Sequence, residues 1–499
     1  MRALTRDELD VDTDAGPVRG VRESELIAWR GIPFARAPMG SLRFRAPRPA
    51  TSWNGIRDAS SFGSSPWQQS ISKVVGYGVP RKAMSEDALT VNVLRQSTDA
   101  PPRPVLVYIY GGGNRIGTSS VYPGTRLVEN GDVVYVTFNY RLGVFGFLDL
   151  SGHSTPGQRF DSNLGLRDQV AALEWVQRNI ASFGGDPENV TIMGESAGAL
   201  AVTTLLAVPA ARGLFARAIA QSSPAAFAYG PERFRGWAED YLRILGVAPS
   251  DVGRLRQLPA GVLARAGAVW SRQVSARTPG ALSVGAMVDG DFLPDYPTAS
   301  IRARLGSVVP LLIGTNANEG NLFARFIPDL ATSPRLIDRL FGQTDPTARS
   351  AVIAAYRGYP GGGAAAQLGG DAAFWHPSVE LAEAQSTVAT VWSYRLDFAT
   401  RLLRLLGMGA THATDTPLVF GSRAGIALGI LGDWGRVRMV SGRMQDRWLS
   451  FVRTGEPGAD WPRYEAVDRA TLVIDREDRV VLDPERRRRL AWDGFPGYR

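Results

Sequence analysis

The stretch Val190-Thr191-Ile192-Met193-Gly194-Glu195-Ser196-Ala197-Gly198-Ala199-Leu200 decides the fold. The apolar run 190–193 predicts a buried strand, and the small and apolar residues after Gly198 predict a helix. Between them lies a Gly-x-Ser-x-Gly turn. A serine between strand and helix is held in strained backbone that exposes its hydroxyl, and glycines flank it because the turn is crowded. Ser196 is therefore the candidate nucleophile. The alternative is a turn in which the glycines only relieve crowding.

Further strands and a helix surround this turn. Continuous apolar runs at 105–110, 133–137 and 310–314 predict buried strands. Apolar residues recur at helical spacing from Leu166 to Ile180, and Gly184-Gly185-Asp186-Pro187 stops that helix. Strand–helix–strand alternation predicts an α/β fold with a mostly parallel sheet and helices on both faces.

Two segments, about 224–280 and 321–390, are rich in Ala and Arg and predict helices without a strand set of their own. We expect them to be helical insertions that form a lid over the main sheet. Within the second, the Gly/Ala-rich stretch 358–370 is expected to be a loop. It contains a formal Gly-x-Gly-x-x-Ala, but Pro360 precedes it where a dinucleotide site needs a strand.

The triple glycine Gly111-Gly112-Gly113 follows the predicted strand 105–110. Three glycines allow a turn tight enough to aim backbone N–H groups at one point. Together with the N–H of Ala197, such donors could hold the oxyanion of a tetrahedral intermediate. The alternative is a loose loop.

A serine nucleophile on this kind of turn needs an acid and a histidine later in the chain. Only His376 and His412 follow Ser196. His376 lies between aromatic residues and proline and is expected to be packed, whereas His412 lies among small residues, as a base with room to move would. Glu319 fits the acid, because it follows a predicted strand. Asp289 and Asp295 are the alternatives.

The composition excludes several kinds of chemistry. The 499 residues include no cysteine and three histidines, which rules out thiol catalysis, iron–sulfur clusters and disulfides and makes a His-rich metal centre improbable. We expect no cofactor and no metal. The net charge is +8, but the arginines are spread among acids, and the run Arg486 to Arg489 is interpreted as a solvated helix face. No nucleic-acid partner is expected. With neither a signal peptide nor a spanning helix in view, we expect a cytoplasmic protein without a membrane span.

Motifs along nearly the whole chain carry a family resemblance. They comprise Arg30 to Ala35, Gly40 to Phe44, Ser85 to Val93, Asn139 to Gly143, Asn163 to Gly198, Gly213 to Ser222, Asp289 to Pro294, the Glu319 loop, the His412 loop and Thr454 to Pro457. In this order they resemble the type-B carboxylesterase (carboxylesterase/cholinesterase) family, and most closely the bacterial para-nitrobenzyl-esterase-like members. The resemblance implies a single α/β-hydrolase domain over residues 1–499.

The resemblance also implies roles for individual residues. Ser196 would be the nucleophile, His412 the general base and then acid, and Glu319 its orienting carboxylate. The oxyanion donors would be the N–H groups of Gly112, Gly113 and Ala197. A second layer around the base would comprise Glu195, Ser222 and Asp415, and the structural ion pairs would be Arg43–Glu86 and Arg141–Asp168.

Three departures from the family pattern bear on function. Pro66 and Ala88 stand where secreted members place disulfide cysteines, which agrees with a reducing compartment. No tryptophan precedes Ser85 where cholinesterases bind a quaternary ammonium, which argues against choline esters. Asn114 replaces a large aromatic residue after the triple glycine and changes the polarity of the pocket wall.

We therefore expect a serine carboxylic-ester hydrolase that acts on short-to-medium acyl or aryl esters through an acyl-enzyme, as a monomer or homodimer. Its partner would be a small-molecule ester bound in an apolar gorge. The alternatives are a carbamate, amide or lipid hydrolase with the same three residues, or a catalytically silent binding protein on the same fold.

Overall fold

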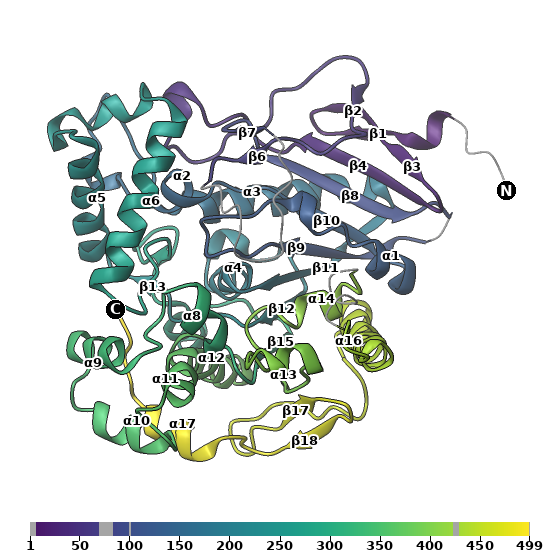
Figure 1. Cartoon of the computed structure of the whole chain (residues 1–499). Coiled ribbons are helices and arrows are strands. Elements are labelled where there is room, and N and C mark those ends of the chain that lie inside the picture. Colours follow the sequence, from purple (N-terminus) through teal and green to yellow (C-terminus); the bar gives the residue numbers. More distant parts are fainter. Residues whose placement is uncertain (1–5, 69–82, 99–100, 423–428, 499) are drawn as a thin grey trace.

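A large twisted sheet forms the centre of the molecule in Figure 1, a computed structural model that describes residues 6–68, 83–98, 101–422 and 429–498. The sheet has 11 strands in the order β18-β17-β16-β15-β12-β11-β9-β10-β8-β4-β3. Their bounds are β18 Arg479–Val481, β17 Thr471–Ile474, β16 Val391–Leu396, β15 Leu311–Asn316, β12 Arg217–Gln221, β11 Gly185–Glu195, β9 Arg103–Ile109, β10 Val134–Phe138, β8 Thr90–Gln96, β4 Leu26–Pro33 and β3 Val21–Glu23.

The strands from β10 to β17 are parallel, and antiparallel strands complete both edges of the sheet. The register sets Val190 of β11 opposite Val105 of β9, and Met193 of β11 opposite Ile219 of β12. These residues are buried, as in a parallel sheet covered on both faces. The predicted strands 105–110, 133–137, 190–193 and 310–314 are confirmed as β9, β10, β11 and β15.

Smaller sheets and pairs lie around this centre. One sheet comprises β1 Asp10–Thr13, β2 Gly16–Arg19 and β5 Arg57–Asp58. Two short parallel pairs are β6 Ser65–Pro66 with β7 Met84–Ser85, and β13 Ala228–Tyr229 with β14 Ala286–Met287. The segment 224–280 was predicted to carry no strands. This prediction is wrong in part, because β13 lies in that segment. A two-residue strand carries too little pattern to be seen in the sequence.

Helices lie on both faces of the sheet, with α4 and α12 on one face and α1 and α16 on the other (Figure 1). The α-helices are α1 Thr125–Gly131, α2 Gly143–Phe147, α3 Leu164–Asn179, α4 Ala197–Leu205, α5 Pro231–Leu245, α6 Ala260–Arg277, α7 Pro297–Arg302, α8 Gly320–Phe326, α9 Pro334–Gln343, α10 Arg349–Ala355, α11 Gly362–Gly370, α12 His376–Ser386, α13 Arg401–Leu405, α14 Thr416–Val419, α16 Trp434–Thr454 and α17 Arg486–Trp492. The predicted helix 166–180 is confirmed as α3, and Gly184 has the left-handed conformation (φ 78°) of a stop signal.

Short helical turns complete the chain. The 3₁₀ turns are η1 Arg6–Leu9, η2 Gly40–Leu42, η3 Ser119–Val121, η4 Ser151–His153, η5 Ile180–Phe183, η6 Pro209–Ala211 and η7 Pro249–Arg256. A π-helical turn, η8 Asp371–Trp375, joins α11 to α12. Within the described ranges, no helix has both the length and the apolar character needed to cross a bilayer.

The loop predicted at 358–370 is wrong, because residues 362–370 form α11. Its last two glycines, Gly369 and Gly370, allow close packing against neighbouring backbone. A Cβ on Gly370 would lie 2.4 Å from the backbone nitrogen of Gly320 on α8, and a Cβ on Gly320 would lie 1.8 Å from the carbonyl oxygen of Ala366. Tertiary contact therefore overrides the low helix propensity of glycine here.

The solvated face predicted for Arg486 to Arg489 is also wrong in part. Arg486 is 73% exposed, but the Arg488 side chain is only 21% exposed and its Nη1 donates to Asp371 on η8 at 2.8 Å. Arg489 pairs with Asp483 at 2.7 Å. The run joins the C-terminal helix α17 to the turn that precedes α12.

Candidate active site

Ser196 lies in a sharp turn between β11 and α4, with φ 58° and ψ −124°. This backbone conformation is rare for a residue with a side chain and persists only where the surroundings impose it. A Cβ on Gly194 would lie 2.4 Å from the carbonyl carbon of Gly198, and one on Gly198 would lie 2.0 Å from the carbonyl oxygen of Ile109. Both flanking positions therefore require glycine.

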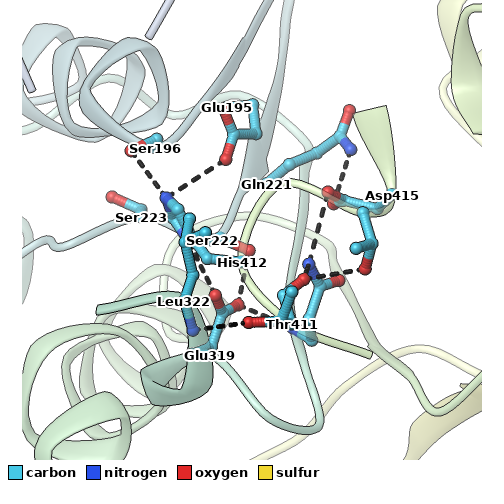
Figure 2. A network of polar contacts seen from close by, with 12 residues as sticks. Glu195, Ser196, Gln221, Ser222, Ser223, Glu319, Leu322, Thr411, His412 and Asp415 are labelled. Atoms are coloured by element: carbon cyan, nitrogen blue, oxygen red, sulfur yellow. Dashed lines mark hydrogen bonds and ion pairs between the residues drawn. The ribbon is translucent and has the colours of Figure 1, made fainter. Parts of the chain in front are cut away.

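His412 lies beside this serine, with its Nε2 2.8 Å from the Ser196 Oγ (Figure 2). Its other ring nitrogen, Nδ1, lies 2.6 Å from Oε2 of Glu319. A carboxylate accepts but does not donate, so Nδ1 carries the proton and Nε2 is free to accept one from the serine hydroxyl. This arrangement suits a serine nucleophile with an oriented base.

Glu319 follows β15 and immediately precedes α8, and its carboxylate is held on both oxygens. Its Oε1 accepts hydrogen bonds from the Ser222 hydroxyl at 2.5 Å and from the Asn316 backbone N–H at 2.7 Å. The side chain is 1% exposed. A buried carboxylate held by two donors fixes the orientation of the imidazole ring that it contacts.

The loop that carries His412 is tied to the same region. The backbone N–H of Leu322 on α8 donates to the Thr411 hydroxyl at 2.9 Å, and the Asn316 amide donates to the Thr411 carbonyl at 2.9 Å. The turn of α8 that begins at Glu319 therefore also holds the residue before the histidine.

Glu195 lies next to the serine and approaches the same nitrogen of His412, with its Oε1 3.3 Å from Nε2 (Figure 2). That oxygen is buried and has no hydrogen-bond partner among the described residues. Burial raises the pKa of Glu195, and the nearby carboxylate of Asp415 adds to the rise. Burial alone would lower the pKa of His412, but the Glu195 and Glu319 carboxylates outweigh it and raise that pKa above its usual range.

Asp415 lies one layer further out and does not contact the histidine. Its carboxylate accepts from the Gln221 amide at 2.7 Å, the Tyr394 hydroxyl at 2.8 Å and the Thr416 N–H at 2.9 Å. Of the three residues placed around the base by resemblance, Glu195 faces His412, Ser222 bonds to Glu319, and Asp415 anchors the start of α14.

Two aromatic rings that the sequence did not single out cover the imidazole. The ring of Phe374, on η8, is centred 4.4 Å from that of His412, and the ring of Phe323, on α8, is centred 5.1 Å away. The expectation of a base with room to move is therefore wrong, since the ring is packed. Phe323 lies four residues, or one helical turn, after Glu319, and this spacing could have placed it near the site. Nothing in the sequence indicated that Phe374 contacts His412.

The alternatives for base and acid lie elsewhere. His376 is buried on α12, where its ring stacks on Trp492 and burial lowers its pKa to about 4. Asp289 accepts from the Ser162 hydroxyl at 2.5 Å and from the Asn163 amide at 3.0 Å. The Asp295 carboxylate accepts from the backbone N–H of Tyr296.

The triple glycine lies against the serine turn. Gly112 and Gly113 have φ of 114° and 61°, and a Cβ on Gly111 would lie 3.1 Å from that of Ser196. Within the described part of the chain, the backbone N–H groups of Gly112, Gly113 and Ala197 have no hydrogen-bond acceptor. Three unpaired donors near a serine hydroxyl can stabilise a developing negative charge.

The two ion pairs expected from the resemblance are formed. Arg43 makes two hydrogen bonds with Glu86, at 2.6 and 2.5 Å, and its Nη1 donates to backbone carbonyls of the segment 255–258. Arg141 binds Asp168 at 2.8 and 2.7 Å. All four side chains are less than 10% exposed, so loss of one partner from either pair would leave a buried charge without its counter-ion.

An α/β-hydrolase fold with this serine–histidine–glutamate arrangement defines a serine hydrolase. The chain belongs to the carboxylesterase family, which it matches over residues 7–491. It is 37% identical to the para-nitrobenzyl esterase of Bacillus subtilis (strain 168), with 96% of this chain and 97% of that protein covered. It is 33% identical to the phenmedipham hydrolase of Pseudarthrobacter oxydans, with 94% and 95% covered.

Solved structures give the same assignment. A PNB esterase structure superposes with a TM-score of 0.89 at 35% identity and covers 97% of this chain and 99% of its own. A carboxylesterase of Geobacillus stearothermophilus superposes with a TM-score of 0.83 at 36% identity, with 97% and 100% covered. The α/β-hydrolase fold and the class of serine carboxylesterase predicted from the sequence are thereby confirmed.

Proposed function

We propose that Ser196, His412 and Glu319 form the catalytic triad of this carboxylesterase. The observation that carries the proposal is the pair of hydrogen bonds on one imidazole, 2.8 Å to the serine hydroxyl and 2.6 Å to the carboxylate. The Ser196 Oγ attacks the ester carbonyl while Nε2 of His412 takes its proton, and Glu319 stabilises the imidazolium that results.

The oxyanion of the tetrahedral intermediate accepts hydrogen bonds from the N–H groups of Gly112, Gly113 and Ala197. His412 then returns the proton to the leaving alcohol, which leaves an acyl-serine. Water, deprotonated by the same histidine, releases the acid and restores the hydroxyl. These three N–H groups donate to no acceptor among the described residues, which supports this assignment.

The proposed substrates are small esters of short-to-medium acids or of aryl alcohols, since the relatives include a para-nitrobenzyl esterase. A second candidate is a carbamate, since a relative at 33% identity is a phenmedipham hydrolase. The helical segments 224–280 and 321–390 are proposed as insertions of one domain that cover the site, and the absence of cysteine supports a cytoplasmic location.

The test is release of p-nitrophenol from p-nitrophenyl acetate, butyrate, octanoate and palmitate. Ser196→Ala and His412→Ala should lose activity, by about 10³-fold or more. His153→Ala is the matched control, because this half-buried histidine on η4 lies outside the site. Equal activity in the wild type and in Ser196→Ala would disprove the proposal. The chain-length profile and a phenylcarbamate assay separate short esters, lipids and carbamates.

A further inference from the structure

The turn that carries the proposed oxyanion donors is held by side chains as well as by its own backbone. The N–H groups of Arg115 and Ile116 both donate to the carbonyl of Gly112, at 3.2 Å, and close the turn. Beyond it, the Gln68 side chain binds both the N–H and the carbonyl of Gly117. Glycines adopt many conformations by themselves, so the direction of the Gly112 and Gly113 N–H groups depends on the contacts that hold this turn.

Arg115 makes the charged contact of this turn. Its guanidinium forms a two-point pair with the carboxylate of Asp329, and its Nη1 also donates to the Ser271 hydroxyl at 3.2 Å. The same guanidinium lies along Gly113, since a Cβ built on that glycine would be 3.4 Å from Nε and Nη2. The guanidinium therefore occupies the space beside Gly113.

The partners of Arg115 come from both helical segments. Ser271 lies on α6 in the first, and Asp329 follows α8 in the second. Asp329 is itself held by the first segment, because the Ser275 hydroxyl on α6 donates to its Oδ1 at 3.0 Å and the backbone N–H of Gly280, just after α6, donates to its carbonyl. The Arg115 and Asp329 side chains are 24% and 13% exposed, so water screens the pair only in part.

We propose that Arg115 is a positioning residue for ester hydrolysis, which through Asp329 fixes the Gly112–Gly113 turn against both helical segments. The proposal rests on the oxyanion role assigned to that turn above. A bidentate guanidinium–carboxylate pair fixes direction as well as distance, which suits a group that orients a neighbouring backbone. Errors of about 1 Å in such a position cost about 100-fold in rate.

The test compares p-nitrophenyl butyrate hydrolysis by the wild type, Arg115→Met, Asp329→Asn, Arg115→Lys and the double variant Arg115→Met/Asp329→Asn. Each of the two charge-removing single variants should lower kcat about 10- to 100-fold with KM within about twofold. The double variant should be no slower than the slower single variant, since both break one interaction. Arg115→Lys keeps the positive charge but cannot form the two-point pair with Asp329. It should retain more activity than Arg115→Met.

A second readout separates positioning from general destabilisation. A trifluoromethyl ketone that adds to the serine creates an oxyanion, so its inhibition constant should rise in parallel with the fall in kcat/KM. Binding of the product alcohol should not change. Arg277→Met is the control for loss of an arginine–carboxylate pair, because Arg277 on α6 contacts Asp240 on α5 at 2.5 Å, away from the turn and with a more exposed guanidinium.

Unchanged kcat in folded Arg115→Met and Asp329→Asn would overturn the proposal. Faster hydrolysis by Asp329→Asn would also overturn it, since the Arg115 charge would then act directly on the oxyanion. If Arg115→Met does not fold, Asp329→Asn and Arg115→Lys carry the test. A wild type no faster than Ser196→Ala would instead contradict the proposed function.

Discussion

Glu195 Oε1 and Ser196 Oγ both face Nε2 of His412, at 3.3 and 2.8 Å. A second carboxylate thus lies beside the nitrogen that takes the serine proton, in addition to Glu319 on the other side of the ring. The histidine acts as a base only when it is neutral, so the charge of Glu195, together with that of Glu319, affects the pH at which the site becomes active.

Glu195→Gln should therefore move the rise of kcat/KM to lower pH. The Glu195 carboxylate raises the pKa of His412 by stabilising the imidazolium, and removing that charge lowers it. The imidazole then loses its proton at a lower pH. The measurement is a pH–rate profile between pH 5 and 10 with p-nitrophenyl acetate. Glu174→Gln, at an exposed site on α3, should leave the profile unchanged, and a shift of Glu195→Gln to higher pH would contradict the prediction.

Gly320→Ala should reduce both stability and activity. The new methyl would lie 1.8 Å from the carbonyl oxygen of Ala366, so α8 and α11 must separate and Glu319 must move. Overpacking of this kind costs about 1 to 3 kcal/mol in the free energy of unfolding. Urea denaturation and kcat measure the two effects.

The control for that variant lies in the same pair of helices. A Cβ on Gly363 of α11 meets nothing within 4 Å, so Gly363→Ala should keep activity and stabilise the protein by about 0.4 to 1 kcal/mol. Equal stability of the two variants would show that α8 and α11 are not closely packed.

The strand–turn–helix around Ser196 and the strand before Glu319 could be predicted because both depend on local pattern. A parallel strand buried on both faces is a continuous apolar run, and the serine turn leaves room only for glycine. The position of Glu319 after a predicted strand favoured it over Asp289, and the family resemblance implied the same role. The contact of Phe374 with His412 could not be predicted, since Phe374 lies on a π-helical turn whose position depends on α11 and α17. The low helix propensity of Gly370 predicts a loop. The residue is helical in the structure because its small size allows close packing against α8.

Asn114 gives a test of the turn itself. Its φ is 54°, in the left-handed region, and its Nδ2 donates to the Val284 carbonyl at 2.9 Å. Asn114→Gly should lose only the hydrogen bond, about 1 kcal/mol in the free energy of unfolding. Asn114→Ala should lose a further amount of about 1 kcal/mol, because its Cβ disfavours this backbone conformation. Guanidinium denaturation of both variants checks the order, and a more stable Asn114→Ala would contradict it.

Arg488→Met should destabilise the protein strongly at neutral pH. The carboxylate of Asp371 is 4% exposed and bonds to Arg488, Tyr356 and Gln367, so loss of the guanidinium leaves a buried charge without its counter-ion. Breaking a buried pair from one side costs about 3 to 5 kcal/mol. Arg486→Met, at the exposed end of the same run, should change stability by less than about 0.5 kcal/mol.

The loss in Arg488→Met should shrink as the pH falls. Burial raises the pKa of Asp371, and without Arg488 the pKa rises further, above its value in the unfolded chain. Because the pKa of Asp371 is then higher in the folded state than in the unfolded state, the folded state takes up its proton first as the pH falls. The free energy of unfolding of Arg488→Met therefore rises relative to its value at neutral pH. Arg488→Met/Asp371→Asn should recover part of the loss and show no such dependence. Denaturation curves at pH 7 and pH 5 measure both effects; an equal loss in Arg488→Met at the two pH values would mean that the Asp371 charge is not the cause.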